Sequence, residues 1–93
     1  MDSAQQENKI KAIAHDLVDG LGRWKAPVMI HMSKEPLERN DLEGLADAVE
    51  EEFKNHKYIA GGKFLLSHST DFKQFKLQIP TEDLNAWMES LGY

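Results

Sequence analysis

Four histidines are the residues of this chain whose side chains are best suited to bind a metal ion. They are His15, His31, His56 and His68. Zinc sites usually take two ligands from one short stretch, such as two histidines one helical turn apart, and no two of these histidines are that close in sequence. His31 and His68 fall in expected strands and could meet across a sheet, but a histidine on a strand more often packs and forms hydrogen bonds. The spacing therefore predicts no metal site.

Serine, histidine and aspartate also occur close together, within residues 67–71. Neighbouring residues of a strand point to opposite faces, and catalytic triads draw on separate segments, so we expect no triad here. Gly61-Gly62-Lys63 lacks the upstream glycine of a phosphate-binding loop, and Phe64 stands where that loop has serine or threonine. The chain has no cysteine, which excludes thiol nucleophiles, disulfides and iron–sulfur clusters. We expect no catalytic site, no cofactor and no enzyme activity.

Charged residues divide the chain into an acidic part and a basic part. The net charge is −5, with residues 1–53 net acidic and residues 54–79 net basic. Carboxylates on the outer side of the expected second helix could meet a partner protein with a basic surface. The candidate partner-binding residues are Asp41, Glu43, Asp47, Glu50 and Glu51. The alternative is that this side of the helix is solvated and only keeps the protein soluble.

Lysines and aromatic residues alternate in the basic part, a composition that suits single-stranded nucleic acid. The candidate residues are Lys57, Tyr58, Phe72, Lys73 and Lys76, and the rings of Tyr58 and Phe72 are expected to be exposed for stacking on bases. A pI of about 5.3 opposes binding to a polyanion. Nucleic-acid binding is therefore the alternative to protein binding.

Three segments have the 3.6-residue periodicity of helices that bury one face. The first is expected to end at Gly20 or Gly22. The second is expected to begin at a cap formed by Asn40 or Asp41, and the third at Thr81. Their apolar positions are Ile10, Ile13, Ala14, Leu17, Val18 and Leu21; Leu42, Leu45, Ala46, Val49 and Phe53; and Leu84, Trp87, Met88 and Leu91.

Alternating patterns indicate strands between these helices. In residues 27–33, the side chains of Val28, Ile30 and Met32 are expected to face the core. Residues 63–69 and 72–79 are separated by only Thr70 and Asp71 and indicate a β-hairpin. A short strand at residues 58–60 would make the sheet four-stranded instead of three-stranded.

The order α-β-α-β-β-α predicts an α+β fold, a single two-layer domain over residues 1–93. We expect a small mixed or antiparallel sheet with helices packed mainly on one face. The first two strands would be parallel if they were neighbours, because a helix connects them. Trp24 is expected to pack against the core from the end of the first helix. An exposed indole there would instead mark a binding surface. The side chains expected to be almost fully buried are Leu17, Ile30, Val49, Leu77 and Trp87.

The length and composition fit such a domain. The 93 residues suffice for one hydrophobic core. No secretory signal and no apolar run of bilayer length stands out, so we expect a cytoplasmic protein that does not enter the membrane. The sequence as a whole predicts a small, acidic, non-catalytic interaction protein, such as an inhibitor, adaptor or regulator. It would bind a larger protein with a basic surface or associate with itself; a small enzyme is the third alternative.

Overall fold

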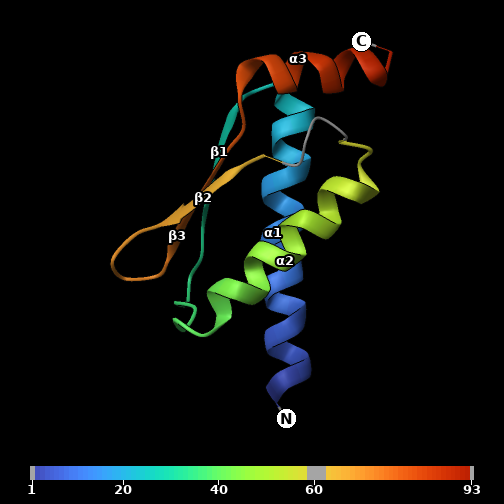
Figure 1. The fold of residues 1–93 in the computed structure, drawn as a ribbon. Helices are drawn as coiled ribbons and strands as arrows, with labels where there is room; N and C mark the ends of the chain where they lie inside the picture. The colour runs from blue at the N-terminus through green and yellow to red at the C-terminus, as the bar shows by residue number, and fades with distance from the viewer. Residues whose placement is uncertain (1, 59–62, 93) are drawn as a thin grey trace.

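Helices and strands follow one another in the predicted order (Figure 1). The computed structural model describes residues 2–58 and 63–92. Its elements are α1 (Asp2–Trp24), β1 (Val28–Met32), α2 (Asp41–Asn55), β2 (Leu65–His68), β3 (Gln74–Gln78) and α3 (Thr81–Ser90). The helices pack on the sheet, which confirms the α+β fold and its element order.

The sheet has the strand order β1-β3-β2 and is antiparallel throughout. The hairpin predicted between the last two strands is confirmed, and it places β2 beside β3. β1 occupies the other side of β3, so the first two strands are not neighbours and no parallel pair forms. Tyr58 belongs to no strand, and the other two residues of the predicted fourth strand lie outside the described residues.

Two glycines within α1 allow neighbouring elements to pack closely against the helix. The sequence predicted that the helix ends at Gly20 or Gly22, but the helix continues through both residues to Trp24. A Cβ atom at Gly20 would lie 2.6 Å from Cε of Met29, and one at Gly22 would lie 3.1 Å from Cη2 of Trp87. The chain leaves the helix where Lys25 adopts a positive φ of 51°. The glycines therefore provide room for β1 and α3.

The first turn of α2 is attached to α1 by a side-chain hydrogen bond. Asn40 precedes the helix but its side chain makes no capping hydrogen bond. Asp41 lies in the helix, and its carboxylate accepts hydrogen bonds from the main-chain N–H of Glu38 at 2.9 Å and from Nε2 of Gln6 at 2.6 Å. The predicted start of α2 is thus confirmed to within one residue, with Asp41 in a structural role.

The apolar sides of the helices and the inner side of β3 form one core. All six predicted positions of α1 are buried. Leu17, Val49, Leu77 and Trp87 are at most 1% exposed, which confirms four of the five side chains expected to be almost fully buried. Ile30 is 47% exposed, so the prediction for this residue is wrong.

β1 has the opposite orientation to the predicted one. Met29 and His31 turn toward the helices, and the three side chains predicted to face the core point outward. Met29 packs over Gly20, and Nδ1 of His31 lies 2.6 Å from Oδ2 of Asp16. Because both faces of β1 carry apolar residues, the alternating pattern did not determine the orientation. The space at Gly20 and the polar partner at Asp16 determine it.

Candidate functional site

The outer face of the sheet is not covered by any other part of the described chain. Val28, Ile30, Met32 and Leu65 are large apolar residues on this face, and all four are exposed, Met32 to 75% and Leu65 to 69%. We call this surface the open sheet face. Its outward side chains are Val28, Ile30 and Met32 of β1, Gln74, Lys76 and Gln78 of β3, and Leu65 and Ser67 of β2.

The register of the strands arranges these side chains in rows across the sheet. Gln78 lies between Val28 and Leu65. In the next row, Lys76 lies between Ile30 of β1 and Ser67 of β2. The apolar side chains of this face therefore come from the two edge strands, and the side chains that the central strand contributes to it are all polar. Lys76 carries the only charge among these outward side chains, and no carboxylate is present on them.

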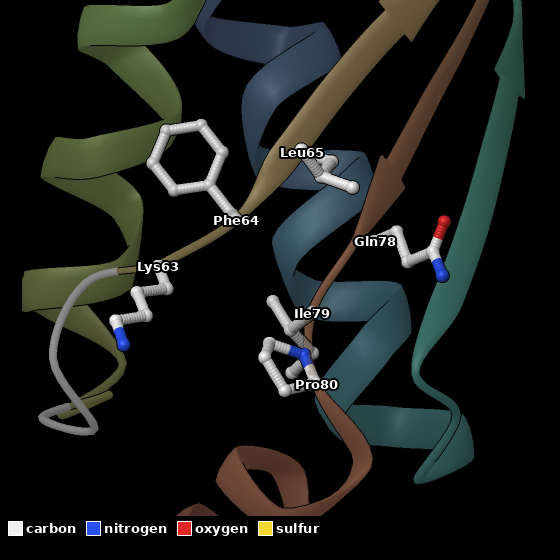
Figure 2. Close-up of a pocket in the computed structure, with 6 residues that line it drawn as sticks. All are labelled: Lys63, Phe64, Leu65, Gln78, Ile79 and Pro80. Atoms are coloured by element: carbon white, nitrogen blue, oxygen red, sulfur yellow. The ribbon is translucent and has the colours of Figure 1, made fainter.

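A small pocket adjoins one end of the open sheet face, where β2 begins and β3 ends (Figure 2). Its volume is about 220 Å³. Pockets for small molecules usually measure about 300–1,000 Å³, so this one suits an apolar side chain of a partner better than a cofactor. Six residues line it: Lys63, Phe64, Leu65, Gln78, Ile79 and Pro80.

An exposed indole lies beside the edge strand β1. Trp24 is 71% exposed, so the prediction that it packs against the core is wrong. It follows the last buried position of α1, Leu21, and lines a surface hollow together with Met29. Exposed tryptophans are enriched among residues that contribute most to protein binding. The region around β1 therefore combines exposed aliphatic and aromatic side chains.

The acidic residues predicted to bind a partner lie mostly on the solvent side of α2. Glu43, Asp47, Glu50 and Glu51 are exposed. Asp41 differs, because it is half-buried and holds the helix start through the hydrogen bonds given above. The helices cover the inner face of the sheet, so the outer side of α2 and the open sheet face belong to different sides of the molecule (Figure 1). A role of the four exposed carboxylates in binding stays a prediction.

Tyr58 is not available for stacking on nucleic acid, contrary to the prediction. The residue is 5% exposed, and its ring centroid lies 4.4 Å from that of Phe53 and 5.2 Å from that of Trp87. Its hydroxyl donates a hydrogen bond to the carbonyl oxygen of Lys63 at 3.2 Å. The reason is a chain reversal after α2, where Lys57 has a φ of 61° and directs the next side chain into the core.

The remaining residues of the predicted nucleic-acid face do not form one surface. Phe72 is half-buried, and its ring stacks on that of His68 at a centroid distance of 4.6 Å. Lys73 lies in the hairpin turn, whereas Lys57 follows the end of α2, and these two places lie on opposite sides of α1 (Figure 1). Lys76 alone belongs to the open sheet face. The structure therefore places the three lysines at different parts of the surface, at the end of α2, in the hairpin turn and on β3.

The buried phenol of Tyr58 predicts a loss of stability in alkaline solution. Burial raises the pKa of Tyr58 to about 12, with a further contribution from the negative charge of Asp83. The folded state therefore favours the neutral phenol, and this stabilisation is complete below the ordinary pKa of 10.0 and is lost as the pH rises toward 12. We expect the midpoint of thermal unfolding to fall more steeply between pH 10 and 12 in the wild type than in Tyr58→Phe. Equal slopes in circular dichroism melts of the two proteins would contradict this prediction.

The cluster of serine, histidine and aspartate forms the hairpin turn. Oγ of Ser69 donates to Asp71 and accepts a hydrogen bond from the main-chain N–H of Gln74. Asp71 also accepts one from the N–H of Lys73, and these bonds, with that from Ser69 first, keep the pKa of the Asp71 carboxyl below its ordinary value. Nδ1 of His68 donates a hydrogen bond to the carbonyl oxygen of Ser69. In none of these contacts does a serine hydroxyl donate a hydrogen bond to a histidine nitrogen, as a catalytic serine would.

The histidines meet in a different combination from the one considered in the sequence. His31 and His68 flank Phe75 from opposite sides, because their strands are the two edges of the sheet. His15 of α1 and His56 at the end of α2 lie close together instead, with Glu52 between them, and one ligand atom from each lies within 4.8 Å of the others. The spacing of four residues between Glu52 and His56 was the available signal. Their partner on another helix could not be identified from spacing.

The helices in the described part of the chain are too short or too polar to cross a membrane. No family model, no curated protein and no solved structure matches the chain.

Proposed function

We propose that this chain is a non-catalytic interaction domain that binds another protein through the open sheet face. The observation that carries the proposal is the set of exposed apolar residues Val28, Ile30, Met32 and Leu65 on one face of the sheet. Single exposed apolar residues are common on soluble proteins, but a group of them on one face is typical of a surface that a partner covers. Burial of this group in a complex would supply the hydrophobic contribution to binding.

The charges of the open sheet face indicate the chemistry of the partner. Lys76 stands in the middle of the face, Lys63 lines the adjoining pocket, and no outward side chain of the three strands is acidic. A complementary surface would present apolar side chains with carboxylates among them. One apolar side chain would enter the pocket beside Leu65, and a carboxylate would face Lys76, which would orient the complex.

The acidic side of α2 remains a second candidate surface. Its four exposed carboxylates favour a partner with a basic surface, which is the opposite of the partner expected at the open sheet face. The two surfaces can therefore be distinguished by the same binding experiment. The exposed carboxylates alone also suit a solvated surface, so the open sheet face is the stronger candidate.

Substitution of Ile30 by glutamate is expected to abolish capture of the partner without unfolding the domain. Ile30 is 47% exposed, so the new charge can stay in water in the free protein but would be desolvated in the complex. The hot-spot residues near the centre of an interface each contribute at least about 2 kcal/mol, and loss of such a contribution weakens affinity about 30-fold. The measurement is affinity capture from a lysate of the source organism. A photo-crosslinking residue at position 32 would label the captured protein, and circular dichroism would verify the fold.

The matched control changes the acidic side of α2 by replacing Glu43, Glu50 and Glu51 with glutamine and Asp47 with asparagine. This variant should capture the same protein as the wild type. If it loses the partner while Ile30→Glu keeps it, the working surface is α2 and the proposal is wrong. Recovery of RNA or DNA in place of a protein would support the nucleic-acid alternative. A crosslink from position 32 to a second copy of this chain would show self-association.

A further inference from the structure

Two polar pairs face each other where α2 packs on α1. His15 and Asp19 lie one turn apart on α1, and Glu52 and His56 lie one turn apart across the end of α2. Residues four apart on a helix share one side, so each helix presents a histidine and a carboxylate to the other. Nδ1 of His15 lies 3.0 Å from Oε1 of Glu52, and the two imidazole centroids are 5.8 Å apart.

The distances in this cluster are close to those required by a metal ion. His15, Glu52 and His56 each offer one ligand atom within 4.8 Å of the others. Tetrahedral coordination of zinc with bonds of about 2.0–2.2 Å places its ligand atoms ~3.3 Å apart. The separation of 3.0 Å between Nδ1 of His15 and Oε1 of Glu52 is close to this value. Side-chain rotations that shorten the remaining separations, which are up to 4.8 Å, would bring the three ligands to one ion.

The hydrogen bonds around His56 resemble those that support a metal ligand. A carbonyl oxygen only accepts hydrogen bonds, so Nδ1 of His56 must donate to the main-chain oxygen of Glu52, at 2.9 Å. The neutral ring then has its free lone pair on Nε2. A metal-bound histidine commonly donates a hydrogen bond from the N–H of its second ring nitrogen in this way. This hydrogen bond determines both the tautomer and the orientation of the ring.

A second carboxylate lies on the other side of this ring. Nε2 of His56 is 3.8 Å from Oδ1 of Asp19, and Oδ2 of Asp19 is 3.0 Å from Arg23. The main chain of His56 is held as well, because its carbonyl oxygen accepts a hydrogen bond from Nε1 of the buried Trp87 at 2.8 Å. The main chain of His56 is therefore held by Trp87, and the ring lies between the carboxylates of Glu52 and Asp19.

We propose that His15, Glu52 and His56 form a binding site for a divalent transition-metal cation of the zinc type, with Asp19 as a second acidic group at its edge. Two imidazoles and a carboxylate are ligands that suit Zn²⁺ and Co²⁺, and the carboxylates of Glu52 and Asp19 supply the negative charge that the ion requires. The bound ion would connect α1 and α2. His15 is exposed, and with Asp19 it lines a surface hollow, so an ion can enter from solvent.

Isothermal titration calorimetry with ZnCl₂ on the full chain tests this site. We expect one equivalent of Zn²⁺ to bind, the thermal unfolding midpoint to rise, and Co²⁺ to give the visible absorption of a low-symmetry site. His56→Asn and His15→Asn should each weaken Zn²⁺ binding by more than about 100-fold, because loss of a mere supporting residue already costs about 10–100-fold. Asp19→Asn should have a smaller effect. Circular dichroism without metal would establish that each variant is folded.

His68→Asn is the matched control, because it removes an exposed histidine outside the cluster. This variant should bind Zn²⁺ as the wild type does. In NMR spectra of the histidine rings, only His15 and His56 should shift when one equivalent of Zn²⁺ is added. The proposal is overturned if the wild type binds no stoichiometric Zn²⁺, or if the His15 and His56 variants bind it unchanged. The cluster would then be a set of hydrogen bonds between two helices and nothing more.

Discussion

Replacement of Trp87 by alanine is expected to lower the free energy of unfolding by about 3–5 kcal/mol, a large part of the total of about 5–15 kcal/mol typical of a domain. Trp87 is 1% exposed and packs edge-on against Tyr58 and Phe53, at centroid distances of 5.2 and 6.2 Å. It also donates the hydrogen bond to the carbonyl oxygen of His56. Loss of the indole would leave a cavity between α1, α2 and α3 and an unpaired carbonyl group.

The matched control for this prediction is the other tryptophan. Trp24 is 71% exposed, so Trp24→Ala should change the free energy of unfolding by no more than about 0.5 kcal/mol. Urea denaturation followed by circular dichroism measures both variants. Trp87→Phe keeps most of the apolar volume and loses the hydrogen bond, so its loss should lie between the two and remain measurable if Trp87→Ala does not fold. Equal losses at Trp24 and Trp87 would show that α3 does not contribute to the core.

The second large effect is expected at Leu77, which should lose about 2–5 kcal/mol of stability when replaced by alanine. Leu77 is fully buried on the central strand, where it faces the helices between Met29 on one neighbouring strand and Leu66 on the other. Leu17 on α1 is equally buried, and Leu17→Ala should show a loss in the same range. Chemical denaturation at constant pH provides the free energies.

Ile30→Ala is the informative comparison for Leu77→Ala, because the alternating pattern of its strand had placed Ile30 in the core. Its exposure of 47% in the structure predicts a loss well below that of Leu77, of the order of 1 kcal/mol or less. Losses of similar size at Ile30 and Leu77 would mean that β1 faces the helices with Ile30. In that case the open sheet face proposed as the binding surface would not exist.

The sequence by itself determined the helices, the hairpin and most of the core. The six apolar positions of α1 are buried because residues three and four apart share one side of a helix, whatever that side packs against. The hairpin follows from two strand patterns that lie close together in the sequence, since so short a connection leaves antiparallel pairing as the only arrangement. In the structure the connection is residues 69–73 instead of the predicted Thr70 and Asp71. These features depend on periodicity within one segment, so they could be predicted without knowledge of the other segments.

The tertiary structure decided which side of β1 faces inward and where the nearby aromatic residues lie. β1 has apolar residues on both faces, so its orientation depended on the space at Gly20 and the carboxylate of Asp16 on another element. Tyr58 entered the core because the chain reverses at Lys57. Neither the orientation of β1 nor the burial of Tyr58 could be predicted from the pattern of apolar and polar residues within its own segment.

The histidine cluster shows the same division between local pattern and tertiary contact. The spacing of His15 from Asp19 and of Glu52 from His56 places each pair on one side of a helix, and this much is determined by the sequence. The meeting of His15 with Glu52 depends on the angle and offset at which α1 and α2 pack. Those two quantities result from the fit of many side chains at once, and no spacing within a single segment encodes them.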